Sequence, residues 1–295
     1  MSIKVKDFTY CRKIFFIAPD TTIFPESYLE EYFALGYEVY FVENEQHIDL
    51  KTKVRYLFSL FDDAVFFFNV DAVIPGVNWV DFISELSTRC RNMVSIGVFY
   101  TKKTNKEMGN LYARKYLYEI GVTAGCIQLE YQKKLNLMII ERVLFANQAK
   151  GRRQNIRALC TKDYNYSFIK DDITFTGSLQ DISLSHFSLM VPDDDKKLVL
   201  EVGDKIPEFH FFLNGLLFRS PVIMMMKRKS NEATLYVFAY MNETGAGLNP
   251  RYKQQLAPNL YRLMTTKLKQ IIELIHKLDS EQEFDPRTIG DMAIE

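Results

Sequence analysis

The first half of the chain alternates short apolar runs with longer amphipathic segments. The apolar runs are rich in β-branched and aromatic residues: KIFFIA (13–18), EVYFV (38–42), AVFFFNV (64–70), MVSIGVFY (93–100) and CIQLE (126–130). Continuous apolar runs are typical of parallel strands that are covered on both faces. The intervening and following segments have helical length and spacing: 25–36, 47–61, 77–90, 106–121 and 133–148. Residues 1–146 are therefore predicted to form a five-stranded, doubly wound α/β domain.

The pattern changes near residue 147. The polar and basic stretch NQAKGRRQN favours a linker over 147–157. Six apolar stretches follow without helical segments between them: NIRALC (155–160), DITFTGSLQDIS (172–183), HFSLMV (186–191), EFHFFLN (208–214), LLFRSPVIMMMK (216–227) and ATLYVFAY (233–240). They predict a six-stranded antiparallel β-barrel or sandwich, closed by a helix with one apolar face. We place this second domain at 158–280 and expect 281–295 to be a solvated tail.

The composition supports two folded domains and argues against some classes of binding partner. The chain has 295 residues, of which 47% are hydrophobic and 25% charged, enough apolar material for two cores. Lys plus Arg and Asp plus Glu both total 37, and each half of the chain is also balanced. This balance argues against binding to DNA, RNA or an anionic membrane surface. A bound nucleotide would instead need a few well-placed arginines.

The cysteines and histidines point to a reduced compartment and to no metal. Four widely separated cysteines form no C-x-x-C pair: Cys11, Cys90, Cys126 and Cys160. They are typical of reduced core residues in a cytoplasmic protein. No run is long and apolar enough for a membrane span, and the start of the chain does not resemble a secretion signal. With only four scattered histidines, we expect neither a metal site nor a cofactor.

Two short motifs at the start of the second domain contain side chains suited to binding a guanine nucleotide. Arg153 and Arg157 form R-x-x-x-R with Arg152 just ahead, and Asp181 and Ser183 form D-x-S on a predicted strand. The planar guanidinium of arginine matches guanine O6 and N7 as well as phosphate oxygens. A carboxylate accepts from guanine N1 and N2, and the alternation of a strand puts the D-x-S side chains on one face. The alternative is a solvated basic linker and an ordinary strand-end hydrogen bond.

In this order and setting the motifs resemble the PilZ domain, the bacterial receptor module for cyclic di-GMP. The signature of that family is R-x-x-x-R in a linker, followed by D-x-S-x-x-G on a barrel strand. The resemblance covers about residues 150–280. It includes the G-D pair at Gly203 and Asp204 before the next strand, and the C-terminal helix that packs on the barrel.

The resemblance implies six ligand-binding residues: Arg152, Arg153, Arg157, Asp181, Ser183 and His186. The two motif arginines would bind the guanines and phosphates of cyclic di-GMP, and Asp181 and Ser183 would hold a guanine edge. In the family an arginine just before the motif often accompanies binding of a stacked ligand pair, a role open to Arg152. His186 stands where the signature has glycine, and is expected to narrow the site or to add a stacking ring.

The first half resembles the receiver domains of response regulators. In that family the phospho-accepting aspartate follows the third strand and lies four residues before a Pro-Gly pair, as Asp71 does before Pro75 and Gly76. Thr101, at the end of the fourth predicted strand, matches the hydroxyl switch position of the family. The resemblance makes Asp71 a possible phosphoacceptor and Thr101 its switch residue.

The catalytic parts of a receiver are nevertheless missing. Phosphoryl transfer to aspartate needs a divalent cation held by an acidic pair after the first strand, where this chain has Ala18, Pro19 and Asp20. The lysine expected after the fifth strand is absent, because Gln128, Leu129 and Glu130 occupy that region. We therefore interpret the domain as a degenerate receiver in which Asp71 and Thr101 are vestigial.

Three hypotheses follow. The first is a cytoplasmic cyclic di-GMP effector that is not an enzyme, changes its interdomain arrangement on ligand binding and signals to a protein partner through the receiver-like domain. The second is a degenerate PilZ and pseudo-receiver scaffold that mediates protein–protein interaction without nucleotide. The third is an active phospho-receiver. No Gly-rich phosphate loop follows a first-half strand, and no nucleophile motif suggests catalysis.

Overall fold

The computed structural model describes residues 3–9, 11–25, 27–89, 94–101, 105–151, 154–192, 198, 200–229, 233–243, 245–286 and 288–294. Contacts divide the chain into two compact units. Val5–Gln154 and Gln270–Met292 form an α/β unit, and Asn155–Lys269 with residues from both chain ends forms a β unit. The boundary between Gln154 and Asn155 lies within the linker predicted from the sequence.

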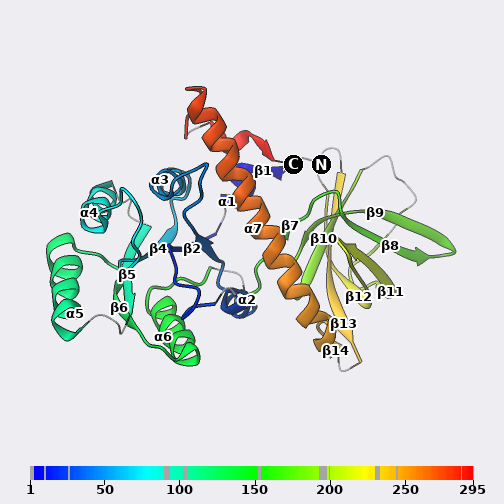
Figure 1. Ribbon diagram of the computed structural model, residues 1–295. Coiled ribbons are helices and arrows are strands. Elements are labelled where there is room, and N and C mark those ends of the chain that lie inside the picture. The colour runs from blue at the N-terminus through cyan, green and yellow to red at the C-terminus, as the bar shows by residue number, and fades with distance from the viewer. Residues whose placement is uncertain are drawn as a thin grey trace. The chain divides into compact units, whose positions relative to one another are not determined.

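The α/β unit is built on a parallel sheet in the order β3-β2-β4-β5-β6. Its strands are β2 (Lys13–Ile17), β3 (Val39–Val42), β4 (Ala64–Asn69), β5 (Val94–Thr101) and β6 (Gly125–Leu129). The helices of this part of the chain are α1 (Val5–Thr9), α2 (Ser27–Ala34), α3 (Leu50–Leu60), α4 (Trp79–Arg89), α5 (Lys106–Tyr112), the π-helix η1 (Ala113–Ile120) and α6 (Lys133–Ala146). Helices α3 and α4 cover one face of the sheet, and α2 and α6 the other (Figure 1). The predicted doubly wound fold and its five strands are confirmed.

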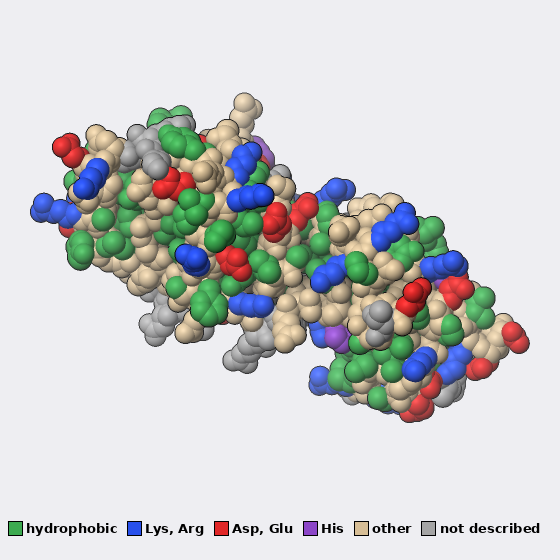
Figure 2. All heavy atoms as spheres, turned by 90° about the horizontal axis from the view of Figure 1, so that it is seen from below, with side chains coloured by type: hydrophobic (Ala, Val, Ile, Leu, Met, Phe, Trp, Pro, Cys, Tyr) green, Lys and Arg blue, Asp and Glu red, His purple; other side chains and the backbone are tan. Residues whose placement is uncertain are grey.

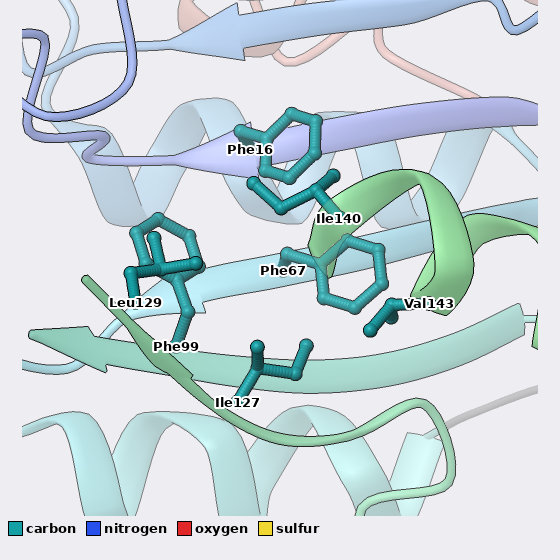
Figure 3. Close-up of a pocket in the computed structure, with 7 residues that line it drawn as sticks. All are labelled: Phe16, Phe67, Phe99, Ile127, Leu129, Ile140 and Val143. Atoms are coloured by element: carbon teal, nitrogen blue, oxygen red, sulfur yellow. The ribbon is translucent and has the colours of Figure 1, made fainter. Parts of the chain in front are cut away.

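Burial on both faces explains why the strands are continuously apolar. All six residues of β4 are buried, including Phe66, Phe67 and Phe68. On the α6 side, side chains from four strands and the helix surround a void of about 10 Å³ (Figure 3). These are Phe16, Phe67, Phe99, Ile127, Leu129, Ile140 and Val143. The sheet thus forms a closely packed base for the loops that follow its strands.

Two glycines end helical segments of the α/β unit. Gly36, after α2, has a φ of +89°, and Gly121, after η1, has a φ of +75°. Both lie in the left-handed region, where a side chain would strain the backbone. At Gly36 an added Cβ would also lie 2.6 Å from the backbone oxygen of Gln154. Glycine at position 36 therefore allows the left-handed turn after α2 and also allows the backbone at Gln154 to lie close to it.

The β unit is a closed six-stranded antiparallel barrel, which confirms the predicted fold (Figure 1). The strands pair in the order β10-β13-β12-β11-β8-β9, and β9 pairs with β10 to close the ring. They are β8 (Tyr164–Lys170), β9 (Ile173–Ile182), β10 (His186–Pro192), β11 (Lys205–Leu213), β12 (Leu216–Lys229) and β13 (Ala233–Asn242). Two short strands lie outside the ring: β7 (Ala158–Leu159) pairs with β9, and β14 (Gly245–Ala246) pairs with β13. Closure removes the exposed edges of the sheet.

One of the six predicted barrel strands was placed wrongly. The stretch NIRALC contributes only the two residues of β7, and the sixth ring strand is β8, YNYSFIK, which the apolar pattern does not predict. Within β8, the buried residues Tyr164, Tyr166 and Phe168 alternate with Asn165 and Ser167. The strand alternates because only one of its faces lies in the barrel core.

Aromatic side chains fill the barrel, and a long helix packs on it. The fully buried ring of Phe187 lies 4.8 to 5.4 Å, between ring centroids, from four other rings: Phe209, Phe211, Phe238 and Tyr240. The helix α7 (Pro250–Ser280) begins in the barrel unit, where Tyr164 donates a hydrogen bond of 2.8 Å to Asn259 Oδ1. The predicted C-terminal helix is therefore present, and it begins several residues earlier than its apolar pattern.

The segment predicted as a solvated tail has structure. Within 281–295, Ile289–Asp291 form a short 3₁₀-helix, η2, and β15 (Ala293–Ile294) pairs with β1 (Ile3–Lys4). Ile289 and Ile294 are buried. The segment is also held by a salt bridge of 2.6 Å between Lys6 Nζ and Asp291 Oδ1, so the prediction of a solvated tail was wrong for this part of the chain.

The charges on one face of the molecule agree with the balanced composition. Basic and acidic side chains are interspersed over the face in view in Figure 2. None of the helices in the described ranges is long and apolar enough to cross a membrane.

Candidate functional site

The D-x-S motif lies at the tight connection between β9 and β10. Ser183 is 1% exposed, and its Oγ donates to the backbone oxygen of His186 at 2.9 Å. The same Oγ accepts hydrogen bonds from the backbone N–H groups of Ser185 and His186, at 3.3 and 3.0 Å. The Ser183 hydroxyl therefore stabilises the turn. The turn itself sets the positions of Asp181, just before it, and His186, just after it.

The second arginine of R-x-x-x-R lies beside the aspartate of D-x-S. Arg157 Nη1 is 3.8 Å from Asp181 Oδ2. The short strand β7 produces this approach, because it begins one residue after Arg157 and pairs Leu159 with Asp181. The side chains of Arg157 and Asp181 are 35% and 16% exposed, so both reach the surface. Arg152 and Arg153 lie outside the described residues.

His186, the residue in the glycine position of the signature, belongs to the same surface. Its Nδ1 is 2.8 Å from Ser185 Oγ, and its side chain is half-buried. Partial burial lowers the pKa of the imidazole from its ordinary value of 6.5, and the positive charge of Arg157 lowers it further. A neutral ring therefore lies near Arg157 and Asp181 at pH 7.

This shift predicts a pH dependence of barrel stability. Because the pKa of His186 is lower in the folded state, the unfolded chain takes up the proton more readily as the pH falls below 6.5. The contribution of His186 is present above 6.5 and is lost as the pH falls through the lowered value. We expect wild type to lose more barrel stability than His186→Gln in unfolding measurements between about pH 8 and 5. Parallel curves for the two proteins would contradict this assignment.

A β-bulge next to the aspartate adds two residues that sequence reasoning missed. Asp181 pairs with Ser188 and Leu179 pairs with Leu189, so Gln180 is an extra residue in β9. Leu179 and Ile182 are buried, whereas Gln180 and Asp181 are both partly exposed. The bulge thus turns Gln180 to the outer face beside Asp181, opposite Ser188. The sequence contains one sign of the bulge. The apolar residues Leu179 and Ile182 are three positions apart, whereas residues that face the core from a regular strand are two positions apart.

In the α/β unit, Asp71 and Thr101 meet at the ends of neighbouring strands. Asp71 Oδ2 accepts hydrogen bonds from the backbone N–H of Thr101 at 2.7 Å and from its Oγ1 at 3.0 Å. Both residues line a pocket of about 930 Å³ at the carboxyl ends of β2, β4 and β5, beside Trp79 and Tyr112. The sheet order places this pocket at the topological switch point, where open α/β sheets bind ligands.

The loop after β2 does not present the acidic pair of a receiver. Ala18 has a φ of +51°, and its backbone oxygen accepts a hydrogen bond of 2.9 Å from Asn69 Nδ2. Asp20 Oδ1 accepts from the N–H and the hydroxyl of Thr22, so this carboxylate bonds to its own loop. Over the described residues, no group of three or more His, Cys, Asp or Glu is arranged to hold a metal ion. Asp71 therefore has the Thr101 hydroxyl as a neighbour, but the described residues do not provide a cluster of carboxylates that could bind a magnesium ion.

We therefore expect Asp71 to stay unmodified. Incubation of the full chain with acetyl phosphate and magnesium should give no mass increase, because the carboxylate is bonded to Thr101 and the loop after β2 supplies a single aspartate. Intact-mass spectrometry measures the result. A gain of one phosphoryl group that disappears in Asp71→Ala would show that the domain is an active receiver.

No protein-family model matches the chain, and no curated protein matches it. Among solved structures, the chain is similar to Escherichia coli YcgR in complex with c-di-GMP, with 17% identity and a TM-score of 0.32, over 44% of this chain and 50% of that chain. It is similar to the Bacillus subtilis inhibitor of motility MotI/DgrA, with 14% identity and a TM-score of 0.32, over 39% and 52%. It is also similar to the PilZ domain of Escherichia coli YcgR with c-di-GMP, with 16% identity and a TM-score of 0.31, over 45% and 99%.

The chain thus matches about half the length of the first two of these proteins.

Proposed function

We propose that this protein is a receptor for cyclic di-GMP and not an enzyme, and that the ligand binds on the outer face of the barrel at the β9–β10 turn. The observation that carries the proposal is the approach of Arg157 to Asp181, with 3.8 Å between Nη1 and Oδ2, on the surface of a closed six-stranded barrel. These residues come from the two motifs that resemble the PilZ signature. Their convergence supports a single site.

The chemistry of the pair suits a guanine nucleotide. Asp181 offers a carboxylate that accepts from guanine N1 and N2, and Arg157 offers a planar donor for O6, N7 or a phosphate. The 3.8 Å separation is too long for a strong hydrogen bond between them, so both groups keep capacity for a ligand. Partial burial of Asp181 makes its hydrogen bonds stronger than they would be in open water.

The other residues of the signature take supporting roles in this proposal. Ser183 holds the turn through its three hydrogen bonds and so positions Asp181. His186 presents a neutral ring where the family has glycine, which narrows the site and offers a stacking surface. Arg153 would bind phosphate or guanine from the linker, and Arg152 would allow a second, stacked ligand molecule.

Binding is proposed to have a signalling consequence in the cytoplasm. The linker 147–157 carries the arginines, so a ligand held by them would order the linker against the barrel. We propose that the resulting interdomain arrangement is read by a protein partner through the receiver-like domain. The partner is neither DNA nor RNA in this proposal, because the charges of both halves are balanced.

A thermal-shift measurement tests the proposed ligand. Cyclic di-GMP at about 100 times its Kd should stabilise the folded chain by about 2.7 kcal/mol and raise its melting temperature. The matched control is Arg157→Ala, in which the shift should be reduced or lost. Equal shifts in both proteins, or no shift in wild type, would contradict the proposed site.

A further inference from the structure

The helix α6 carries apolar side chains on its outer face as well as on the face that packs on the sheet. Its inner residues Ile140 and Leu144 are buried. Leu135, Met138 and Phe145 are spaced three and seven residues apart, so they share the opposite face of the helix. They are 38%, 49% and 78% exposed. Exposed apolar side chains that are grouped on one face, unlike single ones, are typical of an interaction surface.

The charged residues on this outer face have no ion-pair partners. Lys134 and Glu141 lie along one edge of the apolar stripe, and Arg142 lies along the other edge with Leu135. Within the described residues, none of these three charged side chains forms an ion pair. Lys134 and Glu141 are separated by about 10.5 Å along the helix axis, which is too far for a pair within one helix. Their charges are therefore available to a second molecule.

We propose that the outer face of α6 binds the same face of a second copy of this chain, with the two helices antiparallel and a two-fold axis at Met138. A two-fold axis brings residue i beside residue j and residue j beside residue i. In an antiparallel pair centred on position 138, position 134 of one helix lies within about 1.5 Å, along the axis, of position 141 of the other. The same edges of the two stripes meet, so Lys134 pairs with Glu141 of the second copy, twice in the dimer.

The other edge of the stripe and its centre are also self-complementary. Leu135 meets Arg142 of the second copy, whose apolar stem can lie over the leucine while its charge stays in water. Met138 packs against itself on the axis. Phe145 faces the beginning of the second helix, just after the exposed Tyr131. A parallel pair would instead place Lys134 against Lys134 and Glu141 against Glu141, so the charges select the antiparallel arrangement.

The size of the face sets the expected affinity. With 14 residues, α6 is about 21 Å long and about 10 Å wide. This face is smaller than the roughly 800 Å² that each partner buries in a standard interface. We therefore expect a weak dimer that dissociates on dilution, with a Kd on the order of tens of micromolar.

Sedimentation velocity of the full chain, without ligand, tests the dimer over concentrations from about 1 to about 200 µM. The average mass should rise from that of one chain towards that of two. Met138→Glu places two like charges on the axis and should keep the chain monomeric over this range. The matched control is Leu217→Glu, at a 65% exposed position of the barrel strand β12, which should dimerise as wild type does. A wild-type chain that stays monomeric, or equal losses in the two variants, would overturn the inference.

Charge reversal tests the antiparallel register. Lys134→Glu creates two contacts between like charges in the dimer and should raise its Kd by about 10-fold, and Glu141→Lys should do the same. The double variant, with both substitutions, restores opposite charges and should return the Kd to within about threefold of wild type. Far-ultraviolet circular dichroism checks that each variant is folded. A double variant that dimerises no better than the single variants would overturn the proposed pairing.

These measurements use no nucleotide, so their failure leaves the proposed cyclic di-GMP site standing. A basic and apolar helix face can also bind an anionic membrane surface. A chain that stays monomeric and floats with vesicles of anionic lipid would assign the face to a membrane and overturn the dimer.

Discussion

Replacing Asp181 with alanine is expected to weaken cyclic di-GMP binding by about 5- to 150-fold, because a paired contact to a guanine edge is worth about 1–3 kcal/mol. The carboxylate lies 3.8 Å from Arg157 and is 16% exposed, so it is accessible but partly shielded from water. Its removal takes away the acceptor for guanine N1 and N2 and leaves those donors unpaired in the complex. Calorimetric titration of the full chain measures the change.

A matched control separates this effect from a general change of charge. Glu243 is an exposed carboxylate on the same barrel, just after β13. Glu243→Ala removes the same charge and should bind cyclic di-GMP with wild-type affinity. If Asp181→Ala binds as tightly as Glu243→Ala while both proteins are folded, Asp181 is not a ligand residue.

Replacing Phe187 with alanine is expected to lower the free energy of unfolding of the barrel by about 3–5 kcal/mol. The ring is fully buried and contacts four other aromatic rings, so its loss leaves a cavity that those rigid neighbours fill poorly. Denaturant unfolding followed by far-ultraviolet circular dichroism measures the loss. The only tryptophan, Trp79, belongs to the α/β unit, so its fluorescence reports that unit separately.

Phe212→Ala is the control for the barrel core. Phe212 lies on β11 of the same barrel, but its side chain is 42% exposed. Its removal should change the free energy of unfolding by about 0.5 kcal/mol or less, as is usual for surface substitutions. Similar losses in Phe187→Ala and Phe212→Ala would contradict the position of the barrel core.

The α/β fold could be predicted from the sequence because its strands are buried on both faces. A run such as AVFFFNV contains a single polar residue, Asn69, and β4 forms there with every residue buried. The barrel is harder to predict, because each strand has one outer face. In β8 the polar residues Asn165 and Ser167 interrupt the aromatic residues, and the strand was missed. The buried Ile289 and Ile294 were missed because single apolar residues carry no periodicity.

In the candidate site, too, some features could be predicted from the sequence and others could not. Arg157 and Asp181 could be expected to approach each other, because two spaced motifs in a barrel context resemble a family signature. Gln180 could not be identified in this way, because its direction depends on the register of β9 against β10. Likewise, the sequence suggests that Ser183 contacts ligand, whereas its hydroxyl bonds to the turn. Register and hydrogen bonding are properties of the folded chain that a linear motif does not contain.

Calorimetric titration of the wild-type chain with cyclic di-GMP tests the central claim most directly. Saturable binding of one or two ligand molecules per chain is predicted, with two favoured if Arg152 supports a stacked pair. The affinity should fall in Arg157→Ala, because Arg157 approaches Asp181 on the barrel surface. A folded wild-type chain that gives no heat of binding, or an Arg157→Ala chain that binds as tightly as wild type, would contradict a cyclic di-GMP site at the β9–β10 turn.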